Sequence, residues 1–359
     1  MSRENEHQLY PLKLAARPVE KVWGGAEITR RYRPDLPADQ PIGELWAVWG
    51  ELAVDNGTLR SRKLDDLARE WPIPLLGRRV AARGYPAFPL LVKILDARET
   101  LSVQVHPDDA YAREHEGEPF GKAEVWYILD AEPGASIIHG VAQPLTRAEV
   151  EDAIEAGALP EKLAHVEVHP GDVVFNPAGT IHATGAGILL YELQQSSDLT
   201  YRFYDWDRND PSRPLHIEQS LDVSDLAPYP QHTIRPVEIR EAGATRTYLC
   251  ACHHFAAELL RVESSVREQP GGECFHILTA LEGAGRVQDV PLDCGESVLI
   301  PASLHEYEVH ADEVLLLVKA YVPDLRADVV EPLRQCGILD ETISQLGGNR
   351  RHSDLARLL

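Results

Sequence analysis

The sequence predicts a mainly β protein with two jelly-roll β-units, helical insertions and a helical carboxy-terminal tail. The first observation behind this prediction is a series of short apolar runs bounded by glycine and proline, among them "FPLLVKIL", "LSVQVHP", "EVWYILD" and "GILLYELQQ". Many short strands separated by closely spaced turn signals are typical of β-sandwiches and barrels. The second observation is an internal repeat, and the third is a helical pattern over the last residues of the chain.

The internal repeat pairs two segments of the first half with two segments of the second half, in the same order. "GKAEVWYILDAEPGA" resembles "GGECFHILTALEGAG", and "GDVVFNPAGTIHAT" resembles "GESVLIPASLHEYEV". The first copy carries a helical insert between its two segments, and the second copy does not. Glu124 and His182 then correspond to Glu273 and His305. Two related β-units in one chain explain this pattern most simply.

The repeat divides the chain into three parts. Residues 1–240 are expected to form the first unit with its helical insertions. Residues 241–322 are expected to form a second, degenerate unit, and residues 323–359 a helical extension.

Helical patterns interrupt the strands at several places. "SRKLDDLAREW" places Leu64, Leu67 and Trp71 on one face of a helix. "LTRAEVEDAIEAG" begins with Thr146, followed three residues later by Glu149, which is the pattern of a capping box. "LHIEQSLDVSDL" predicts a third helix, and the segment from "DLRADVVEPL" onward predicts two or three short ones.

The composition excludes several classes of partner. The 359 residues include 35 Lys and Arg against 57 Asp and Glu, which gives a formal net charge of −22. Such a surface repels nucleic acid and anionic membranes. Five cysteines without a CxxC pair favour a reduced, cytoplasmic chain. The amino-terminal segment lacks the apolar core of a signal peptide, and no apolar run reaches membrane-spanning length. A monomer and a homodimer are both compatible with this composition.

Four residues could together hold a metal ion. In "LSVQVHPDD", alternation along a strand places Gln104 and His106 on one face and two valines on the other. Glu124 begins another alternating strand, and His182 follows a turn. Two imidazoles, a carboxylate and an amide oxygen suit zinc or another divalent first-row metal. Taken singly, each residue is more often a surface or hydrogen-bonded group, so the joint spacing carries the prediction.

The turn before His182 has a recognisable spacing. Gly171, Pro177, Gly179 and His182 follow the pattern G-x₅-P-x-G-x₂-H, which is the second half of the cupin signature. We expect the strand to deliver His182 to the interior of a barrel. Pro177 and Gly179 are expected to shape the turn that aims the imidazole.

The second unit retains only part of this pattern. Glu273 and His305 are present, but no Q-x-H pair precedes them at a matching distance. His253 and His254 in "CHHF" lie nearby without reproducing the pattern. We therefore expect this unit to be structural and the protein to bind one metal ion per chain.

Further polar residues accompany the predicted ligands. Lys93 and Lys122 are two of only seven lysines. Because a desolvated lysine beside a metal can lose its proton, Lys122 is a candidate general base or acid; a snorkelling or salt-bridged surface lysine is the alternative. "ELQQSSDLTYRFYDWDR" forms either a polar pocket or a solvated hairpin with ordinary ion pairs. Its four candidate groups are Glu192, Asp198, Arg202 and Arg208.

Together, these segments resemble type I mannose-6-phosphate isomerases, also called phosphomannose isomerases, in their short bacterial form. The supporting stretches are "KVWGG", "IGELWAV", "FPLLVKILDARETLSVQVHPDD", "GKAEVWYIL", "GDVVFNPAGTIHA" and "YELQQSSDLTYRFYDWDR". They occur in the family's order, and "LSVQVHPDD" is the most specific of them.

The resemblance implies a cupin fold and the interconversion of mannose 6-phosphate and fructose 6-phosphate through an enediol. The partner is then a small phosphorylated sugar. The resemblance implies one zinc ion per chain, held by Gln104, His106, Glu124 and His182. It also implies a substrate pocket with catalytic groups and substrate contacts. The catalytic candidates are Lys93, Lys122, Asp198 and Arg202, and the substrate-binding candidates are Trp23, Glu192 and Arg208.

Two other functions compete with this interpretation. An iron-dependent cupin dioxygenase commonly uses an H-x-H pair, whereas this chain has Gln104 two residues before His106. A non-catalytic sugar-binding cupin would not need a complete metal set together with Lys122 and Arg202. Metal analysis separates the first alternative from a zinc isomerase, and incubation with mannose 6-phosphate separates the second.

Overall fold

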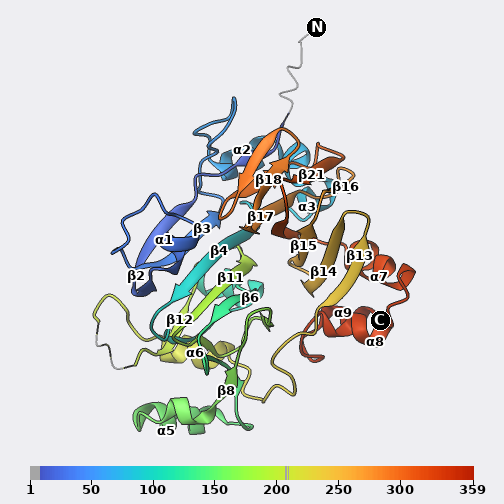
Figure 1. Cartoon of the computed structure of the whole chain (residues 1–359). Helices are drawn as coiled ribbons and strands as arrows, with labels where there is room; N and C mark the ends of the chain where they lie inside the picture. The colour runs from blue at the N-terminus through green and yellow to red at the C-terminus, as the bar shows by residue number, and fades with distance from the viewer. Residues whose placement is uncertain (1–8, 207, 209) are drawn as a thin grey trace.

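The computed structural model describes residues 9–206, 208 and 210–359, and it confirms the predicted mainly β fold. Two pairs of sheets form two β-units that lie side by side, with helices at the periphery (Figure 1). Two of the segments discussed in the sequence analysis include residues that lie outside the described ranges. Residues 1–8 belong to the segment predicted to lack a signal peptide, and Asp207 belongs to the "YDWDR" stretch.

The first unit consists of a six-stranded sheet facing a five-stranded sheet. In spatial order, the six-stranded sheet contains β2 (Arg17–Gly25), β3 (Ile42–Val48), β4 (Leu90–Ala97), β11 (Ile188–Gln195), β6 (Glu124–Ala131) and β9 (Val173–Asn176). The five-stranded sheet contains β12 (Tyr201–Tyr204), β5 (Val103–Val105), β10 (His182–Thr184), β7 (Ser136–Val141) and β8 (Leu163–Glu167).

The second unit repeats this arrangement with a seven-stranded and a four-stranded sheet. The seven-stranded sheet contains β1 (Leu12–Lys13), β20 (Ser297–Ile300), β17 (His276–Glu282), β22 (Leu315–Tyr321), β15 (Ala256–Val262), β14 (Ala244–Ala251) and β13 (Val237–Glu241). The four-stranded sheet contains β16 (Ser265–Glu268), β21 (Tyr307–Ala311), β18 (Ala284–Val287) and β19 (Val290–Asp293).

The strand orders of the two units correspond. The order β3-β4-β11-β6-β9 in the first unit matches β14-β15-β22-β17-β20 in the second. The predicted helical insert lies between β7 and β8, and the corresponding β18 and β19 are joined directly. At the amino-terminal end of the described chain, β1 pairs with β20 and so joins the second unit's sheet. The division at residues 240 and 322 stays a prediction.

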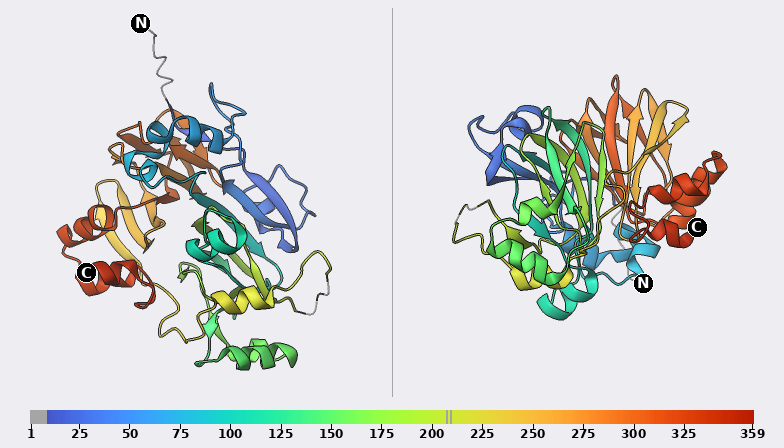
Figure 2. Two further views of the ribbon diagram at one scale, coloured as in Figure 1. Left: turned by 180° about the vertical axis from the view of Figure 1, so that it is seen from behind. Right: turned by 90° about the horizontal axis from the view of Figure 1, so that it is seen from below.

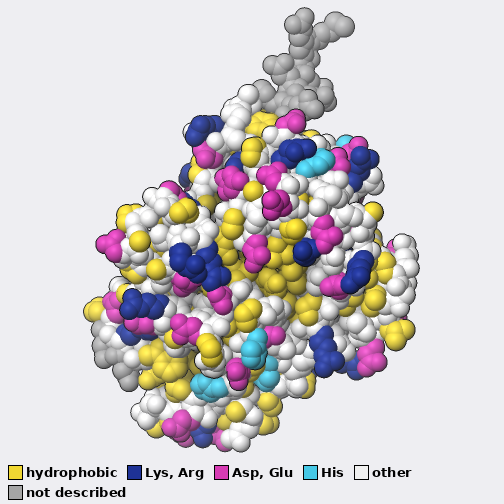
Figure 3. All heavy atoms as spheres, in the orientation of Figure 1, with side chains coloured by type: hydrophobic (Ala, Val, Ile, Leu, Met, Phe, Trp, Pro, Cys, Tyr) yellow, Lys and Arg dark blue, Asp and Glu magenta, His cyan; other side chains and the backbone are white. Residues whose placement is uncertain are grey.

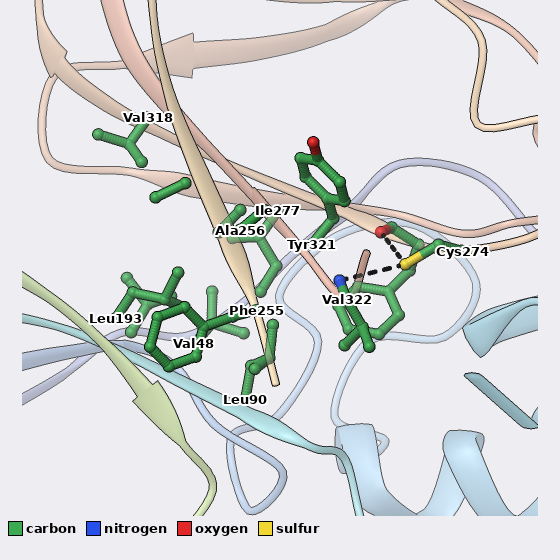
Figure 4. Close-up of a cluster of buried hydrophobic side chains, with 14 of the residues drawn as sticks. Val48, Leu90, Leu193, Phe255, Ala256, Cys274, Ile277, Val318, Tyr321 and Val322 are labelled. Atoms are coloured by element: carbon green, nitrogen blue, oxygen red, sulfur yellow. Dashed lines mark hydrogen bonds between the residues drawn. The ribbon is translucent and has the colours of Figure 1, made fainter. Parts of the chain in front are cut away.

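An apolar layer between the six-stranded and seven-stranded sheets joins the two units (Figures 2 and 4). Val48, Leu90 and Leu193 from the first unit meet Ile277 and Val318 from the second. The opposite face of the six-stranded sheet lines the first jelly roll. Strands covered on both faces are almost continuously apolar, which explains why "FPLLVKIL" lacks the alternation of a half-exposed strand. Lys93 of β4 and Glu192 of β11 point to this inner face, whereas Asp96 of β4 lies on the other face and accepts from the N–H groups of Glu27 and Ile28 in α1.

The helices lie between strands and at the carboxy-terminal end. Those of the first unit are α1 (Glu27–Arg31), α2 (Leu64–Glu70), η1 (Pro72–Leu76), α3 (Arg78–Ala81), α4 (Asp109–Tyr111), η2 (Ala112–Glu116), α5 (Arg147–Glu155), η3 (Leu159–Lys162) and α6 (Ile217–Val223). The predicted capping box is present at α5, where the side chains of Thr146 and Glu149 each accept the other residue's backbone N–H. Residues of α5 and α6 cover the outer face of the five-stranded sheet.

The carboxy-terminal tail packs onto the body of the protein. It contains η4 (Leu325–Val330), α7 (Glu331–Gln335), α8 (Asp340–Gln345) and α9 (Asp354–Leu358). Val329, Ile343 and Leu355 are fully buried in the apolar layer that joins the units. The tail also reaches the first unit, because Arg351 donates to the carbonyls of Ala227 and Pro228.

The charge distribution on one face, the helix lengths and the cysteines describe the outside of the molecule and its redox groups. Acidic and basic side chains are interspersed over the face seen in Figure 3, without a continuous block of one sign. Among the described residues, no helix is long and apolar enough to cross a bilayer. All five cysteines are free. A cytoplasmic location, and the choice between monomer and homodimer, stay predictions.

Candidate metal centre and substrate pocket

One face of the five-stranded sheet gathers three of the predicted site residues. His182 on β10 pairs in register with Gln104 on β5, and Gln104 pairs with Arg202 on β12. Residues directly opposite each other in antiparallel strands point to the same face of the sheet. These three side chains therefore share the face that lines the first jelly roll. The alternation in "LSVQVHPDD" predicts this face for Gln104 alone of the three.

The turn before His182 is held by backbone contacts. Gly179 has a φ of 88°, a conformation that side-chain-bearing residues rarely adopt. A Cβ at Gly179 would lie 2.8 Å from the carbonyl oxygen of Val223. The N–H of Gly179 donates to the carbonyl of His106 over 2.9 Å. The predicted turn therefore fixes His182 relative to His106, which explains why a strand, a glycine turn and a histidine follow one another here.

Glu124, the first residue of β6, meets both histidines from the opposite sheet. Its Oε1 lies 3.2 Å from Nε2 of His182, and its Oε2 lies 3.5 Å from Nε2 of His106. The ligand atoms of these three residues lie within 4.8 Å of one another, and all three side chains are buried. The amide nitrogen of Gln104 lies 3.3 Å from Nε2 of His182, so a half-turn of the amide directs its oxygen into the same space.

The protonation states of the cluster suit a metal ion. Nδ1 of His182 lies 2.8 Å from the carbonyl oxygen of Thr180 and donates to it, so Nε2 is the ring nitrogen that faces Glu124. Burial and the Lys122 ammonium lower the pKa of His106 well below its usual value. Burial opposes ionisation of Glu124, but Lys122 and the two imidazoles hold the pKa of its carboxyl well below the usual range.

The Glu124 carboxylate provides the test of whether these residues fit a metal. Both of its oxygens are buried, and neither accepts a hydrogen bond from the part of the chain that the structure describes. Lys122 is a cationic partner of this carboxylate at 3.3 Å, but a buried carboxylate that accepts no hydrogen bond still gains from a metal ion bound beside it. Two imidazoles, a carboxylate and an amide form a suitable donor set for a divalent first-row metal. The residues therefore fit a metal ion.

Lys122 lies beside this cluster. Its Nζ is 3.3 Å from Oε2 of Glu124 and 3.0 Å from Nε2 of His106, and the side chain is almost completely buried. Lys122 and Glu124 are two residues apart, and both side chains contact His106, so they lie on the same side of the chain, as the sequence predicts. The alternative of a surface lysine is therefore wrong.

A second charged group surrounds Lys93 on β4. Its Nζ lies 3.4 Å from Oε2 of Glu192 and 4.8 Å from the ring centre of Trp46. Burial opposes the charge on Lys93, but Glu44 and Glu192 outweigh it and raise the pKa of the ammonium. Burial and the negative charge of Glu124 raise the pKa of Glu192. Lys93 is therefore held in its charged form. The carboxylates around Lys93 also interact electrostatically with Glu124 of the candidate metal centre.

Glu44 is a member of this group that the sequence analysis missed. The carboxylate accepts a 2.7 Å hydrogen bond from Nε1 of Trp46 and lies 3.2 Å from Nζ of Lys21. Burial opposes its ionisation, but Lys93 and Lys21 lower the pKa of Glu44. The available signal was a single acidic residue within the otherwise apolar run "IGELWAV".

The structure also shows the surroundings of three other predicted site residues, which are Asp198, Arg202 and Trp23. Asp198 is exposed, and its charge contributes to the raised pKa of Lys93. The guanidinium of Arg202 donates to the carbonyl of Pro214 over 3.0 Å. Trp23 is buried in the apolar cluster that also contains Trp126.

Arg208 contacts an acidic side chain and a backbone carbonyl. Its guanidinium lies 3.1 Å from the carboxylate of Asp205 and donates to the carbonyl of Thr100 over 2.7 Å. The contacts of Arg208 are therefore those of an ordinary ion pair, and they bring it to none of the predicted ligands.

The strand registers correct the sequence alignment of the two units. Glu124 pairs with Asn176 on β9, and the corresponding pair in the second unit is His276 with Ile300 on β20. His182 pairs with Gln104, and the corresponding pair is Tyr307 with Glu268. His276 and Tyr307 therefore occupy the positions of Glu124 and His182. The alignment favoured Glu273 and His305, but both lie outside the strands, where Glu273 is half-buried and His305 is exposed.

Comparisons with known proteins agree with this geometry. The family model for the catalytic domain of type I phosphomannose isomerase matches residues 11–136. Mannose-6-phosphate isomerase of Streptococcus mutans is 37% identical over 313 residues, which cover 84% of this chain and 96% of that protein. Mannose-6-phosphate isomerase ManA of Bacillus subtilis is 37% identical over 302 residues, which cover 81% and 92%. The chain belongs to the type I phosphomannose isomerase family.

Solved structures of phosphomannose isomerases share the fold. The Bacillus subtilis mannose 6-phosphate isomerase superposes with a TM-score of 0.76 at 30% identity, covering 87% of this chain and 99% of that chain. A phosphomannose isomerase variant from Salmonella typhimurium superposes with a TM-score of 0.69 at 19% identity, covering 88% and 100%. The predicted family, its cupin-type fold and the enzyme class are confirmed. Membership of an isomerase family disfavours the dioxygenase and the non-catalytic sugar-binding protein.

Proposed function

We propose that this phosphomannose isomerase family member interconverts mannose 6-phosphate and fructose 6-phosphate and holds one zinc ion between Gln104, His106, Glu124 and His182. The observation that supports the metal most strongly is the buried Glu124 carboxylate, which faces two imidazole Nε2 atoms and accepts no hydrogen bond from the described residues. Nitrogen and oxygen donors of this kind suit zinc. The names of the relatives support the choice of sugar.

Zinc held by these residues would supply a Lewis acid that stabilises negative charge developing on a substrate oxygen. The chain itself must then move a proton between C1 and C2 of the sugar, through an enediol. Lys122 borders the cluster and is the group that we assign to this proton transfer. A neutral amine at Nζ takes the proton from one carbon and returns it to the other.

Lys93 and Arg202 have different parts in this proposal. Lys93 is held as a cation by Glu44 and Glu192, so it can attract an oxygen of the substrate but cannot act as a base. Arg202 lies on the same sheet face as Gln104 and supplies a guanidinium, which suits either the phosphate or the enediolate. Replacement of Arg202 by Lys separates these two roles, because loss of a phosphate contact raises KM and loss of an enediolate contact lowers kcat.

Incubation of the purified protein with mannose 6-phosphate tests the proposal, with fructose 6-phosphate as the measured product. Metal content is determined on the same preparation. Zinc-loaded protein that forms no fructose 6-phosphate would contradict the activity. Turnover that depends on iron and is lost with zinc would contradict the choice of metal.

A further inference from the structure

The second jelly roll contains a set of buried charges at the positions of the substrate pocket in the first. Strand pairing defines the correspondence. Lys93 on β4 pairs with Glu192 on β11, and Glu258 on β15 pairs with Lys319 on β22. Because β4 and β11 correspond to β15 and β22 in strand order, each pair occupies the same place in its unit.

The charges at these positions are inverted. On the next strand, Glu44 pairs with Leu95, and the corresponding residue Arg246 pairs with Leu260. A negative, positive, negative series in the first unit is thus replaced by a positive, negative, positive series in the second. In the same order, the two series are Glu44, Lys93, Glu192 and Arg246, Glu258, Lys319.

The places of the metal ligands are also occupied by polar side chains. His276 and Tyr307 stand at the positions of Glu124 and His182, and their Nδ1 and hydroxyl lie 2.8 Å apart. Glu268 pairs with Tyr307 and stands at the position of Gln104. The second unit has therefore replaced a metal cluster with a network of hydrogen bonds and ion pairs.

This network borders a cavity of about 460 Å³, to which Arg246, Glu258, Glu268, His276 and Lys319 contribute. A volume of this size lies within the range of small-molecule sites. Across the apolar part of the same barrel, by contrast, side chains such as Leu260, Leu278 and Val298 fill the interior.

The inner charges of the cavity balance one another. Nζ of Lys319 lies 2.8 Å from Glu258 and 2.7 Å from Glu268, and Arg246 forms ion pairs with both carboxylates. Two cations thus face two carboxylates. Glu241 pairs with Arg246 but does not line the cavity. The interior offers no surplus charge for a free anion or cation, but it presents dense, fixed polar groups.

The rim of the cavity is also paired. Arg79 lies 2.7 Å from Asp328, which belongs to η4 in the carboxy-terminal tail, and Glu273 forms an ion pair with Arg78. The tail therefore forms one wall of the cavity and adds no unpaired charge to it.

Two groups lining the cavity have unused hydrogen-bonding capacity. Burial lowers the pKa of His276 to about 3, so its imidazole is neutral. When Nδ1 accepts from the hydroxyl of Tyr307, Nε2 carries the proton, and it has no partner among the described residues. The hydroxyl of Tyr248, which lines the same cavity, also has no partner within the described part of the chain.

We propose that this cavity is a second binding site, which takes a neutral polyhydroxylated molecule of monosaccharide size. Its hydroxyl groups donate to the carboxylates and accept from His276, Tyr248 and Lys319, while the balanced charges disfavour ionic ligands. A purely structural barrel would gain as much stability from apolar residues at these positions, without the cost of burying four charges. The site is distinct from the metal cluster and does not depend on its activity.

Isothermal titration calorimetry with D-mannose and D-mannitol as probes tests this site. The full-length His182→Ala variant is used, so that the metal cluster of the first unit is disrupted. We expect at least one of the two probes to bind with one molecule per chain, and inorganic phosphate to give no saturable heat. In this background, Tyr248→Phe and His276→Gln should each weaken that binding by about tenfold, the scale of one lost hydrogen bond.

Tyr248→Phe removes only a hydroxyl, so it keeps the test valid if His276→Gln does not fold. In the otherwise native chain, Tyr248→Phe should leave isomerisation of mannose 6-phosphate unchanged. Absence of saturable heat with both probes, or equal affinity in folded Tyr248→Phe, would overturn the proposal. Saturable binding of phosphate displaced by neither probe would also overturn it.

Discussion

Two buried lysines in the first unit differ in their partners, and this difference separates their roles. Lys93 lies between Glu44 and Glu192, which stabilise its charge. Lys122 lies between one carboxylate and the neutral imidazole of His106. Only Lys122 thus borders a cluster that would gain a divalent cation, whose charge would favour the neutral amine.

Replacement of Lys122 by Arg tests the assignment of the base. Arginine keeps the positive charge but does not titrate in the working range. We expect kcat to fall by roughly two to four orders of magnitude, the scale for losing a general base, while zinc is retained. Steady-state kinetics and metal analysis measure the two effects. Lys63→Arg is the matched control, because Lys63 is half-exposed and pairs with Glu51 at the surface.

A rise in KM with little change in kcat would instead indicate that Lys122 binds the phosphate. If Lys122 only attracts the phosphate, arginine can largely replace it, and any loss of activity appears as a higher KM. A kcat close to that of the unchanged protein would remove Lys122 from proton transfer.

Local spacing was sufficient to predict the residues of the candidate metal centre. The other contacts depend on pairing between strands that are distant in sequence, and local spacing does not encode such pairing. Alternation in "LSVQVHPDD" and the glycine turn carry directional information, so Gln104, His106 and His182 meet as expected. Glu44 reaches the pocket only through the register of β3 with β4, which no local pattern encodes. Arg208 contacts Asp205 and the Thr100 carbonyl, which no local pattern encodes, and its part in substrate binding stays a prediction.

At the level of elements, helix α5 follows directly from sequence because its capping box is local. Thr146 and Glu149 satisfy each other's backbone N–H groups, as the spacing predicts. The repeat between the two units was harder to align. The loops before β17 and β21 differ from their counterparts, so Glu273 and His305 precede the strand positions that His276 and Tyr307 occupy.

Removal of the cap gives an element-level prediction. Thr146→Ala should lower the free energy of unfolding by about 1 kcal/mol, because the backbone N–H of Glu149 loses its acceptor. Thr146→Ser keeps the hydroxyl and should remain close to the unchanged protein. Urea unfolding measures both variants. Equal destabilisation by Ala and Ser would show that packing of the methyl group, and not the cap, accounts for the effect.

The charge network of β14, β15, β16 and β22 predicts a pH dependence of stability. Burial opposes ionisation of Glu268, but Lys319 and Arg246 lower the pKa of its carboxyl from 4.5 to about 2. A depressed folded-state pKa contributes stability above the unfolded value, and this contribution is lost as the pH falls from about 4.5 toward 2.

Glu268→Gln should therefore be less stable than the unchanged protein at neutral pH, and the difference should shrink as the pH falls below about 4.5. Urea unfolding at several pH values measures this difference. Glu238→Gln on the exposed face of β13 is the control, and its effect should be small throughout. A difference for Glu268→Gln that stays constant from neutral to acidic pH would contradict the network.

For the whole molecule, one apolar cluster contains residues of both β-units and of the carboxy-terminal tail, so the three parts pack together. The sequence predicts a helical extension over residues 323–359 but does not say what its helices pack against. The structure places Val329, Ile343 and Leu355 in the shared layer. Such packing could not be predicted from sequence, because the helices are short and their apolar faces do not specify a partner.

Leu355→Ala tests the part played by the tail. Removal of this fully buried side chain should lower the free energy of unfolding by about 2 to 5 kcal/mol. Turnover per folded molecule should stay within a few-fold, because the tail contributes none of the predicted site residues. The same is expected of any soluble protein truncated after Pro323. A folded, zinc-loaded variant of either kind without turnover would show that the tail contributes to the site.

The most direct test of the central claim is the metal content of the purified protein and of its His182→Ala variant, measured together with turnover of mannose 6-phosphate. The account predicts one zinc per chain in the unchanged protein. In the variant, stoichiometric zinc and turnover should both be lost, while circular dichroism shows the β-fold intact. Two metal ions per chain, or full zinc retention in His182→Ala, would contradict it.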